Sequence, residues 1–128
     1  MIRVNVSKQS SYPVSSSVLK KSLKDFLAKK GLVSDAEVSV ALVSEKKMLD
    51  LGRKYLKDSK MHNVLAFADE ETKGKFAYPP DGLIRLGEII VCYPQAVKEA
   101  EKENNLIENK ILELVKHGAE HLLGMHHE

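Results

Sequence analysis

Residues 83–92, LIRLGEIIVC, form a long apolar run rich in β-branched side chains, and this run decides the fold class. Its length and composition predict a strand. Before it, residues 69–82 are polar and include two prolines, which indicates a loop or a hairpin connection. After it, Pro94 is placed to open a helix that ends near residue 104.

Working outward from this run, shorter apolar patterns predict the other strands and helices. Ile2, Val4 and Val6 alternate with polar residues, and so do Val38, Val40 and Leu42, which predicts two more strands. Residues 64–67 predict a third short strand. A helix is predicted over residues 15–30, with Gly31 as the stop and an apolar face at helical spacing made of Val18, Leu19, Leu23, Phe26 and Leu27. A second is predicted over residues 44–56 with Met48, Leu51 and Tyr55 inward, and a last helix from a capping box at Asn105 and Glu108.

These elements predict an α+β fold (α/β mixed), with one mixed sheet of about four strands and about four helices. The 128 residues indicate a single domain over residues 1–128, and no repeat or linker interrupts them. In the last helix, an apolar arc from Ile107 to Leu123 has His117 and His121 at its edge. Both imidazoles are therefore expected where the core meets solvent, with Gly118 leaving room for a close neighbour.

Composition narrows the class of protein without deciding its function. The 20 basic and 18 acidic residues leave a net charge of +2, which neither requires nor excludes a nucleic-acid partner. The single cysteine, Cys92, rules out an intramolecular disulfide and fits a reducing compartment. No apolar run suggests a membrane span, and the N-terminus lacks the core of a signal peptide. We therefore expect a cytoplasmic protein, while the oligomeric state is not indicated.

Residues 117–127, HGAEHLLGMHH, carry the spacing H-x-x-x-H-x-x-G-x-x-H. His117 and His121 lie one helical turn apart and point the same way. Gly124 can end the helix in a left-handed conformation, after which the chain can return His127 as a third ligand. Three histidines suit zinc, although nickel or copper could bind, and the open fourth position can hold a water for hydrolysis.

The histidine spacing does not by itself require an open, hydrolytic metal site. The histidines could be ordinary surface residues, or they could form a closed structural zinc site with Cys92 or His62 as the fourth ligand. The same spacing occurs in metzincin proteases, but Gly118 stands where those enzymes need a glutamate base. Glu120 lies about 200° away around the helix and cannot replace it.

The histidine segment resembles the signature H-G-x-L-H-L-x-G-[YF]-D-H of the YbeY family of bacterial metal-dependent endoribonucleases. Two upstream blocks strengthen the resemblance. Residues 51–55 (LGRKY) followed by 63–67 (NVLAF) are similar to the family's L-N-x-x-Y-R and T-D-V-L-S-F, and residues 86–89 (LGEI) are similar to its L-G-D-I strand. Pro94 matches the proline after that strand, so the resemblance spans residues 37–127.

The resemblance implies a zincin-like, metal-bearing helix near the C-terminus and a zinc-dependent endoribonuclease that cuts single-stranded RNA. It also implies a role in maturing the 3′ end of small-subunit rRNA and in ribosome quality control, with the small ribosomal subunit as partner and no membrane. No side chain is assigned as general base. His126 is the one candidate, although it is expected to face outward because its neighbour His127 points inward.

The main departure from the family pattern is Leu56, which stands where the family has an arginine implicated in activity. Arg53 and Lys57 are candidates to replace it as phosphate contacts. Arg85 is another candidate, because a charge inside an apolar run needs a reason. The loss of the arginine also leaves a second function open, a ribosome-associated assembly factor that keeps the metal site but has weak or no nuclease activity.

Overall fold

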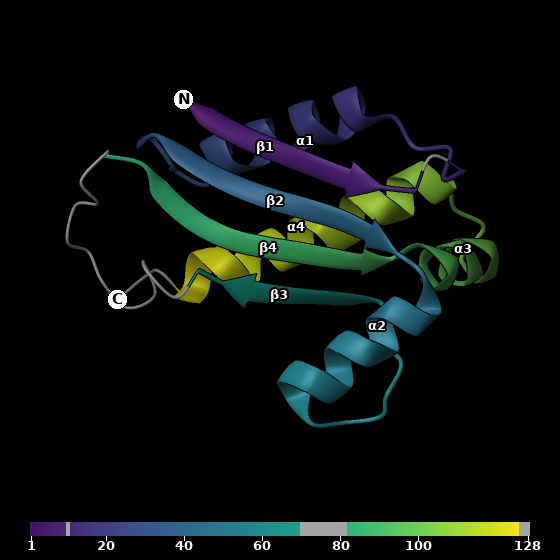
Figure 1. The fold of residues 1–128 in the computed structure, drawn as a ribbon. Helices are drawn as coiled ribbons and strands as arrows, with labels where there is room; N and C mark the ends of the chain where they lie inside the picture. Colours follow the sequence, from purple (N-terminus) through teal and green to yellow (C-terminus); the bar gives the residue numbers. More distant parts are fainter. Residues whose placement is uncertain (10, 70–81, 126–128) are drawn as a thin grey trace.

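The computed structural model describes residues 1–9, 11–69 and 82–125. Within them, one four-stranded sheet has the order β1-β2-β4-β3, so β4 lies inside the sheet and β3 lies at its edge (Figure 1). The predicted single mixed sheet is confirmed. The elements are β1 (Ile2–Lys8), α1 (Ser16–Lys29), β2 (Ala36–Val43), α2 (Glu45–Leu51), the π-helix η1 (Gly52–Leu56), β3 (Val64–Ala68), β4 (Ile84–Cys92), α3 (Tyr93–Lys102) and α4 (Ile107–Met125).

Strand directions make the sheet mixed. β1 pairs with β2 in parallel, β2 pairs with β4 in parallel, and β3 pairs with β4 in antiparallel orientation. The register between β2 and β4 shifts at Glu37/Val38, where β4 contains a bulge next to Gly87. Gly87 has a φ of 137°, and a Cβ there would lie 2.1 Å from the carbonyl oxygen of Phe67. Glycine at this position therefore allows β3 to approach β4 beside the bulge.

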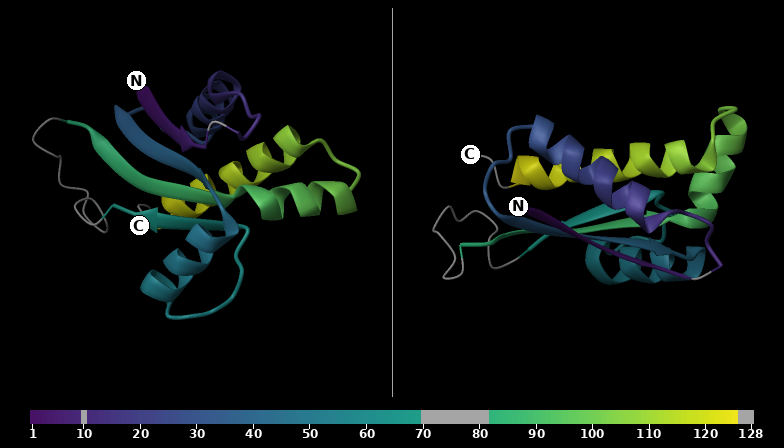
Figure 2. Two further views of the ribbon diagram at one scale, coloured as in Figure 1. Left: turned by 45° about the vertical axis from the view of Figure 1, so that its right-hand side comes forward. Right: turned by 90° about the horizontal axis from the view of Figure 1, so that it is seen from above.

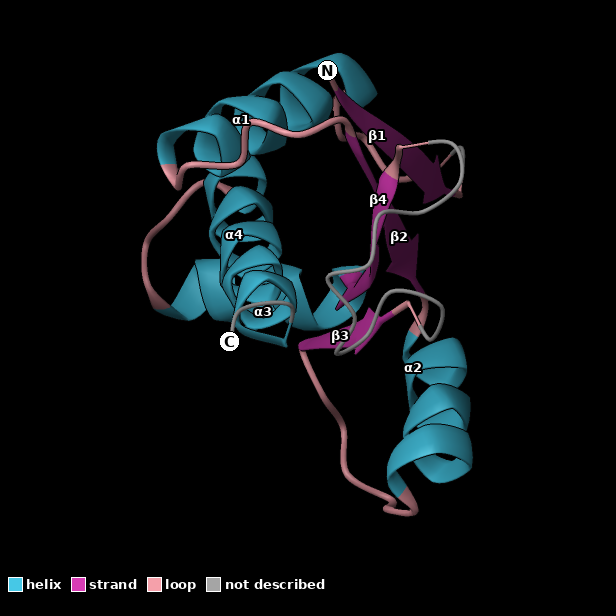
Figure 3. Ribbon diagram, turned by 90° about the vertical axis from the view of Figure 1, so that its left-hand side faces the viewer, coloured by secondary structure: helices cyan, strands magenta, loops and turns pink. Residues whose placement is uncertain are grey.

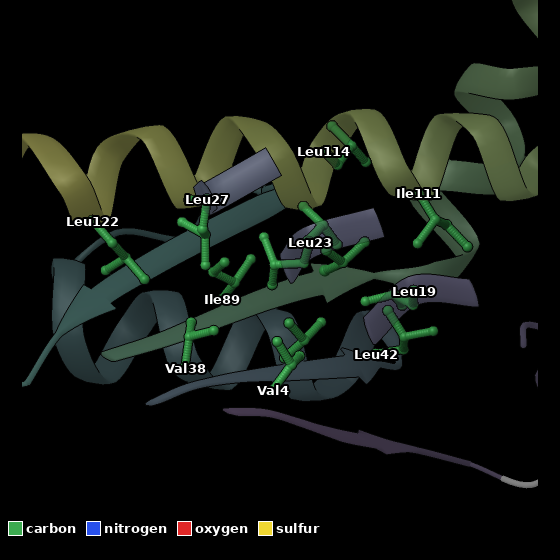
Figure 4. Close-up of a cluster of buried hydrophobic side chains, with 14 of the residues drawn as sticks. Val4, Leu19, Leu23, Leu27, Val38, Leu42, Ile89, Ile111, Leu114 and Leu122 are labelled. Carbon is green, nitrogen blue, oxygen red and sulfur yellow. The ribbon is translucent and has the colours of Figure 1, made fainter. Parts of the chain in front are cut away.

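The main hydrophobic core lies between the sheet and the helices α1 and α4, on what we call the α4 face of the sheet (Figure 2). Alternate residues of β2 point into it, since Val38, Val40 and Leu42 are all buried. Figure 4 shows leucines of α1 and α4 converging on Val38 and Ile89. The largest fully buried side chains here are Leu19, Leu23, Leu27, Val38, Val40, Leu86, Ile89, Val91, Ile111, Val115 and Leu122.

The opposite side of the sheet, the α2 face, carries a smaller core. Met48 of α2 packs with Ile90 and Cys92 of β4, and all three are buried. The Oγ of Ser44 accepts a hydrogen bond from the Lys47 N–H at 3.2 Å, which confirms the predicted start of this helix. Figure 3 shows α4 and α2 on opposite sides of the sheet, with β3 beside both.

Two side chains that were predicted to point inward are exposed. Tyr55 is 54% exposed because the helix after Leu51 continues as the π-helix η1, whose wider turn takes it out of the 3.6-residue phase. Its ring rests against Phe67, with the centroids 5.1 Å apart. Val18 is 43% exposed, because the neighbouring Leu19 occupies the core side of the first turn of α1.

Two predicted helix boundaries are also wrong. Gly124 lies inside α4, which continues to Met125, and it is absent from the described glycines with positive φ. A glycine costs a helix only about 1 kcal/mol relative to alanine, so it does not by itself end one. Asn105 does not cap α4, which begins at Ile107. Its N–H instead donates to the Ala100 carbonyl at 2.9 Å and closes the end of α3.

Candidate metal centre

The helix α4 places two of the predicted ligands side by side. His117 and His121 are both exposed, and their Nε2 atoms lie 3.2 Å apart. The rings meet edge to face, with centroids 4.7 Å apart and an interplanar angle of 84°. The buried Ala119 and Leu122 hold the opposite side of the helix against the core. Because the histidines are four residues apart on one helix, local geometry fixes their separation.

Gly118 determines how closely this part of α4 approaches the sheet. A Cβ at this position would lie 2.7 Å from Cγ2 and 3.3 Å from Cγ1 of Ile89, which is fully buried in β4. Only glycine allows the helix backbone to lie on that side chain. The prediction that Gly118 leaves room for a neighbour is confirmed, and the neighbour is Ile89.

An open groove runs between β3 and α4 and contains both imidazoles. Its volume is about 510 Å³. A second hollow of about 460 Å³ lies on the other side of the histidine pair, next to Glu120 and Gly124. The groove is lined by Asn63, Val64, Leu65 and Ala66 from β3 and the residue before it, and by Lys110, Glu113, Leu114, His117, Gly118 and His121 from α4.

One end of the groove holds a charge cluster that the sequence pattern did not predict. The Lys110 ammonium is buried and lies 2.9 Å from Glu113, 3.0 Å from Glu103 and 3.3 Å from Glu99. The amide of Asn63 donates to both carboxylate oxygens of Glu99, at 3.0 and 3.2 Å. The cluster ties β3, α3 and α4 together. Two features of the sequence could have indicated this cluster. They are the i,i+3 spacing of Lys110 and Glu113 and the i,i+4 spacing of Glu99 and Glu103.

The cluster changes the titration of its lysine. The hydrogen bond to Glu113 is the main cause that raises the pKa of Lys110 above its ordinary value. Burial acts in the other direction, and the bonds to Glu103 and Glu99 add to the increase. One ammonium faces three carboxylates, so this end of the groove carries excess negative charge at neutral pH.

The donor pair has the spacing that a tetrahedral metal requires. Two nitrogens at 2.0–2.1 Å from a tetrahedral zinc ion lie about 3.3 Å from each other. The observed 3.2 Å between the Nε2 atoms fits that value, and it equally fits one neutral imidazole donating a hydrogen bond to the other. His126 and His127 lie outside the described residues. Among the residues that are described, no group of three or more His, Cys, Asp or Glu side chains is placed to hold an ion.

The two alternative fourth ligands lie elsewhere. Cys92 is buried on the α2 face beside Met48, and burial is the main cause that raises the pKa of its thiol. His62 directs its Nε2 toward the two carboxylate oxygens of Asp58, at 3.0 and 3.2 Å. Neither lines the groove that holds the histidine pair.

The predicted phosphate contacts are not gathered around the histidines. Arg53 and Lys57 are exposed at η1, and Arg53 lies 3.8 Å from Asp50 in an ion pair. Lys57 ends η1 in the left-handed conformation, with a φ of 58°. Arg85 is opposite Glu37 in the register and lines a hollow on the α2 face, across the sheet from the histidines. The bulge explains this, because uninterrupted alternation would have put Arg85 on the same face as Ile89.

Comparisons with known proteins give a consistent result. A sequence model described as Endoribonuclease YbeY matches residues 4–128. An Endoribonuclease YbeY from Moorella thermoacetica is 36% identical, and the match covers 94% of this chain and 80% of that protein. One from Dehalococcoides mccartyi is 32% identical over 90% of this chain and 72% of that protein. The solution structure of TM1509 from Thermotoga maritima superposes with a TM-score of 0.64 at 30% identity, covering 100% of this chain and 75% of that one.

Proposed function

The chain belongs to the YbeY endoribonuclease family, and from this we propose that it is a zinc-dependent endoribonuclease that cuts single-stranded RNA in the groove between β3 and α4. We further propose that it acts in the cytoplasm on the 3′ end of small-subunit rRNA, in rRNA maturation and ribosome quality control. In the described part of the chain, no helix is long and apolar enough to cross a membrane.

The observation that carries the proposal is the 3.2 Å distance between the Nε2 atoms of His117 and His121. In this proposal these two imidazoles hold the metal together with His127, which lies outside the described residues. Neutral imidazoles leave a zinc ion its full charge, so the ion when bound would polarise a phosphoryl oxygen and acidify water. Nickel is a second candidate for the same donors.

The chain itself supplies position and orientation. Gly118 lets α4 lie against Ile89, which keeps the two imidazoles beside the edge strand β3. The ion pairs of Lys110 fix the other end of the groove to α3. The proton transfer that RNA cleavage requires has no assigned side chain, and His126, also outside the described residues, is the candidate.

The positions of the basic residues suggest how RNA could lie on the molecule. The carboxylate-rich end of the groove beside Lys110 repels phosphates, so we propose that the strand reaches the histidines from the side of Gly124. Arg53 and Lys57 would contact the strand where it leaves the site past β3, and Arg85 would contact it on the α2 face.

A second function is supported by one observation. Leu56, at the position of the family arginine, is a 43% exposed apolar side chain on η1. A chain without this arginine could bind the small ribosomal subunit as an assembly factor and retain the metal site with weak or no nuclease activity.

Metal analysis and RNA cleavage separate the two functions. Wild-type protein purified without chelators is expected to contain close to one zinc per chain and to cut a single-stranded rRNA fragment. The double variant His117→Ala/His121→Ala should lose both properties, whereas Glu101→Ala, exposed on α3, should retain both. Cleavage by the double variant at the wild-type rate would refute the proposed site. Zinc binding and subunit binding without cleavage would favour the assembly factor.

A further inference from the structure

In the described part of the chain, the edge strand β3 leaves one row of its backbone groups without a partner in the sheet. β3 has a neighbour on one side only, which is β4. The Cys92 N–H donates to the Asn63 carbonyl at 2.9 Å, and the Asp69 N–H donates to the Leu86 carbonyl at 3.3 Å. In an antiparallel pair hydrogen-bonded residues alternate, so Asn63, Leu65, Phe67 and Asp69 direct their N–H and C=O groups toward β4.

The other residues of β3, Val64, Ala66 and Ala68, therefore direct their N–H and C=O groups away from the sheet. Their side chains pack toward the main core on the α4 face. Val64 and Ala66 also line the groove opposite the histidine pair. Among the residues that the structure describes, the groove is thus bounded on one side by a strand edge with no further strand beside it, which is a template for an added strand.

We propose that this edge binds an extended peptide segment of basic composition, which adds to β3 as a fifth strand and lies in the groove beside His117 and His121, so that peptide and RNA occupy the groove in turn and not together. Each outward residue presents one donor and one acceptor, and the outward residues repeat about every 6.8 Å. A peptide strand offers the same groups at the same repeat, whereas a phosphate offers only acceptors. The small side chains of Ala66 and Ala68 leave room for those of the incoming strand.

The negative charge at one end of the groove is the reason to expect a peptide of basic composition. The end of the groove near Asn63 carries Glu99, Glu103 and Glu113 around the single ammonium of Lys110. Glu113 is 59% exposed and Glu103 is 48% exposed, so both carboxylates can meet a ligand. Lysine or arginine on the added strand would be attracted there, and RNA phosphates would be repelled.

Amide hydrogen exchange with a defined probe tests the proposal. The probe is the peptide acetyl-Lys-Val-Thr-Val-Lys-Thr-Lys-amide, and the control is the same peptide with every backbone nitrogen methylated, which keeps the charge but removes the donors along both edges. The probe should slow the exchange of the Val64, Ala66 and Ala68 amides about tenfold or more. Leu65 and Phe67, which are already bonded to β4, should change little. The methylated peptide should give no protection.

Two protein variants make the test specific. Ala66→Pro removes an outward N–H without breaking a bond to β4 and should weaken binding of the probe about fivefold or more, whereas Ala66→Ser, which keeps the N–H and a small side chain, should bind it as the wild type does. Glu113→Gln should weaken binding several-fold at low salt.

Unchanged amide exchange at millimolar probe would overturn the proposal. So would equal protection by the methylated peptide, or protection of the three amides by a single-stranded RNA oligonucleotide and not by the probe. RNA cleavage is not a readout in these experiments, so their result is independent of the proposed nuclease function.

Discussion

Replacing Gly118 with alanine tests how strongly the close approach of α4 to β4 limits the side chain at this position. The added Cβ would lie 2.7 Å from Cγ2 of Ile89, a branched and fully buried side chain that has little freedom to move aside. Overpacking of this kind costs about 1–3 kcal/mol. Alanine is also more favourable than glycine in a helix by about 1 kcal/mol, which offsets part of this cost. The net decrease in the unfolding free energy should therefore be about 0–2 kcal/mol.

Gly124→Ala is the matched control, because in the described part of the chain no atom lies within 4 Å of a Cβ at that position. It should gain up to about 1 kcal/mol, so the two variants should differ by about 1–3 kcal/mol in chemical denaturation. In an Ile89→Ala background the contact is absent, and Gly118→Ala should then be stabilising. Equal stability of the two single variants, or the same loss in both backgrounds, would refute the reasoning.

Three further predictions concern stability and reactivity. Lys110→Met should lower the unfolding free energy by about 1–3 kcal/mol at pH 7, because it leaves three carboxylates without their cation; a loss of the same size at pH 3 would contradict this. Folding raises the pKa of Lys110, so its ammonium contributes fully to the unfolding free energy below the ordinary lysine pKa of about 10.4. Above that pH the contribution decreases, and the difference in unfolding free energy between wild type and Lys110→Met should shrink. Lys57→Gly should gain about 1 kcal/mol in the same denaturation assay because φ is 58°, whereas Lys57→Ala should gain nothing. Cys92 should react with a thiol reagent only as fast as the protein opens, since the thiol is buried and its pKa is raised; rapid labelling of the native protein would contradict its position.

Much of the fold could be predicted from local patterns. The alternation of Val38, Val40 and Leu42 and the apolar run of residues 83–92 predicted the two inner strands, because side chains on a strand must alternate between faces. The serine before α2 predicted its start for an equally local reason, a hydrogen bond to the first turn. Patterns of this kind depend only on residues that are close in the sequence, so they can be recognised without knowing the tertiary structure.

Two of the errors arose where one added residue or one wider turn changed the phase of the side chains. The bulge beside Gly87 reverses the alternation along β4, and it put Arg85 on the face opposite to the histidines. The wider turn of the π-helix η1 changed the direction of the Tyr55 side chain, which is exposed and not buried. At the candidate site, the spacing of His117 and His121 was visible because it is local, whereas the cluster around Lys110 joins three elements and the open edge of β3 depends on strand order.

The order of the strands has a consequence for which parts of the sheet form first. Neighbouring residues of β2 and β4, such as Ala36 and Ile84, are 48 positions apart in the chain, whereas Ala68 and Gly87 of the outer antiparallel pair are only 19 apart. Closing the longer loop costs more entropy, by somewhat less than about 1 kcal/mol, so the pairing of β2 with β4 should form later than the pairing of β3 with β4. Since β3 lies within that loop, the short pairing of β3 with β4 can form early, but its attachment to the rest of the sheet must wait for the later pairing.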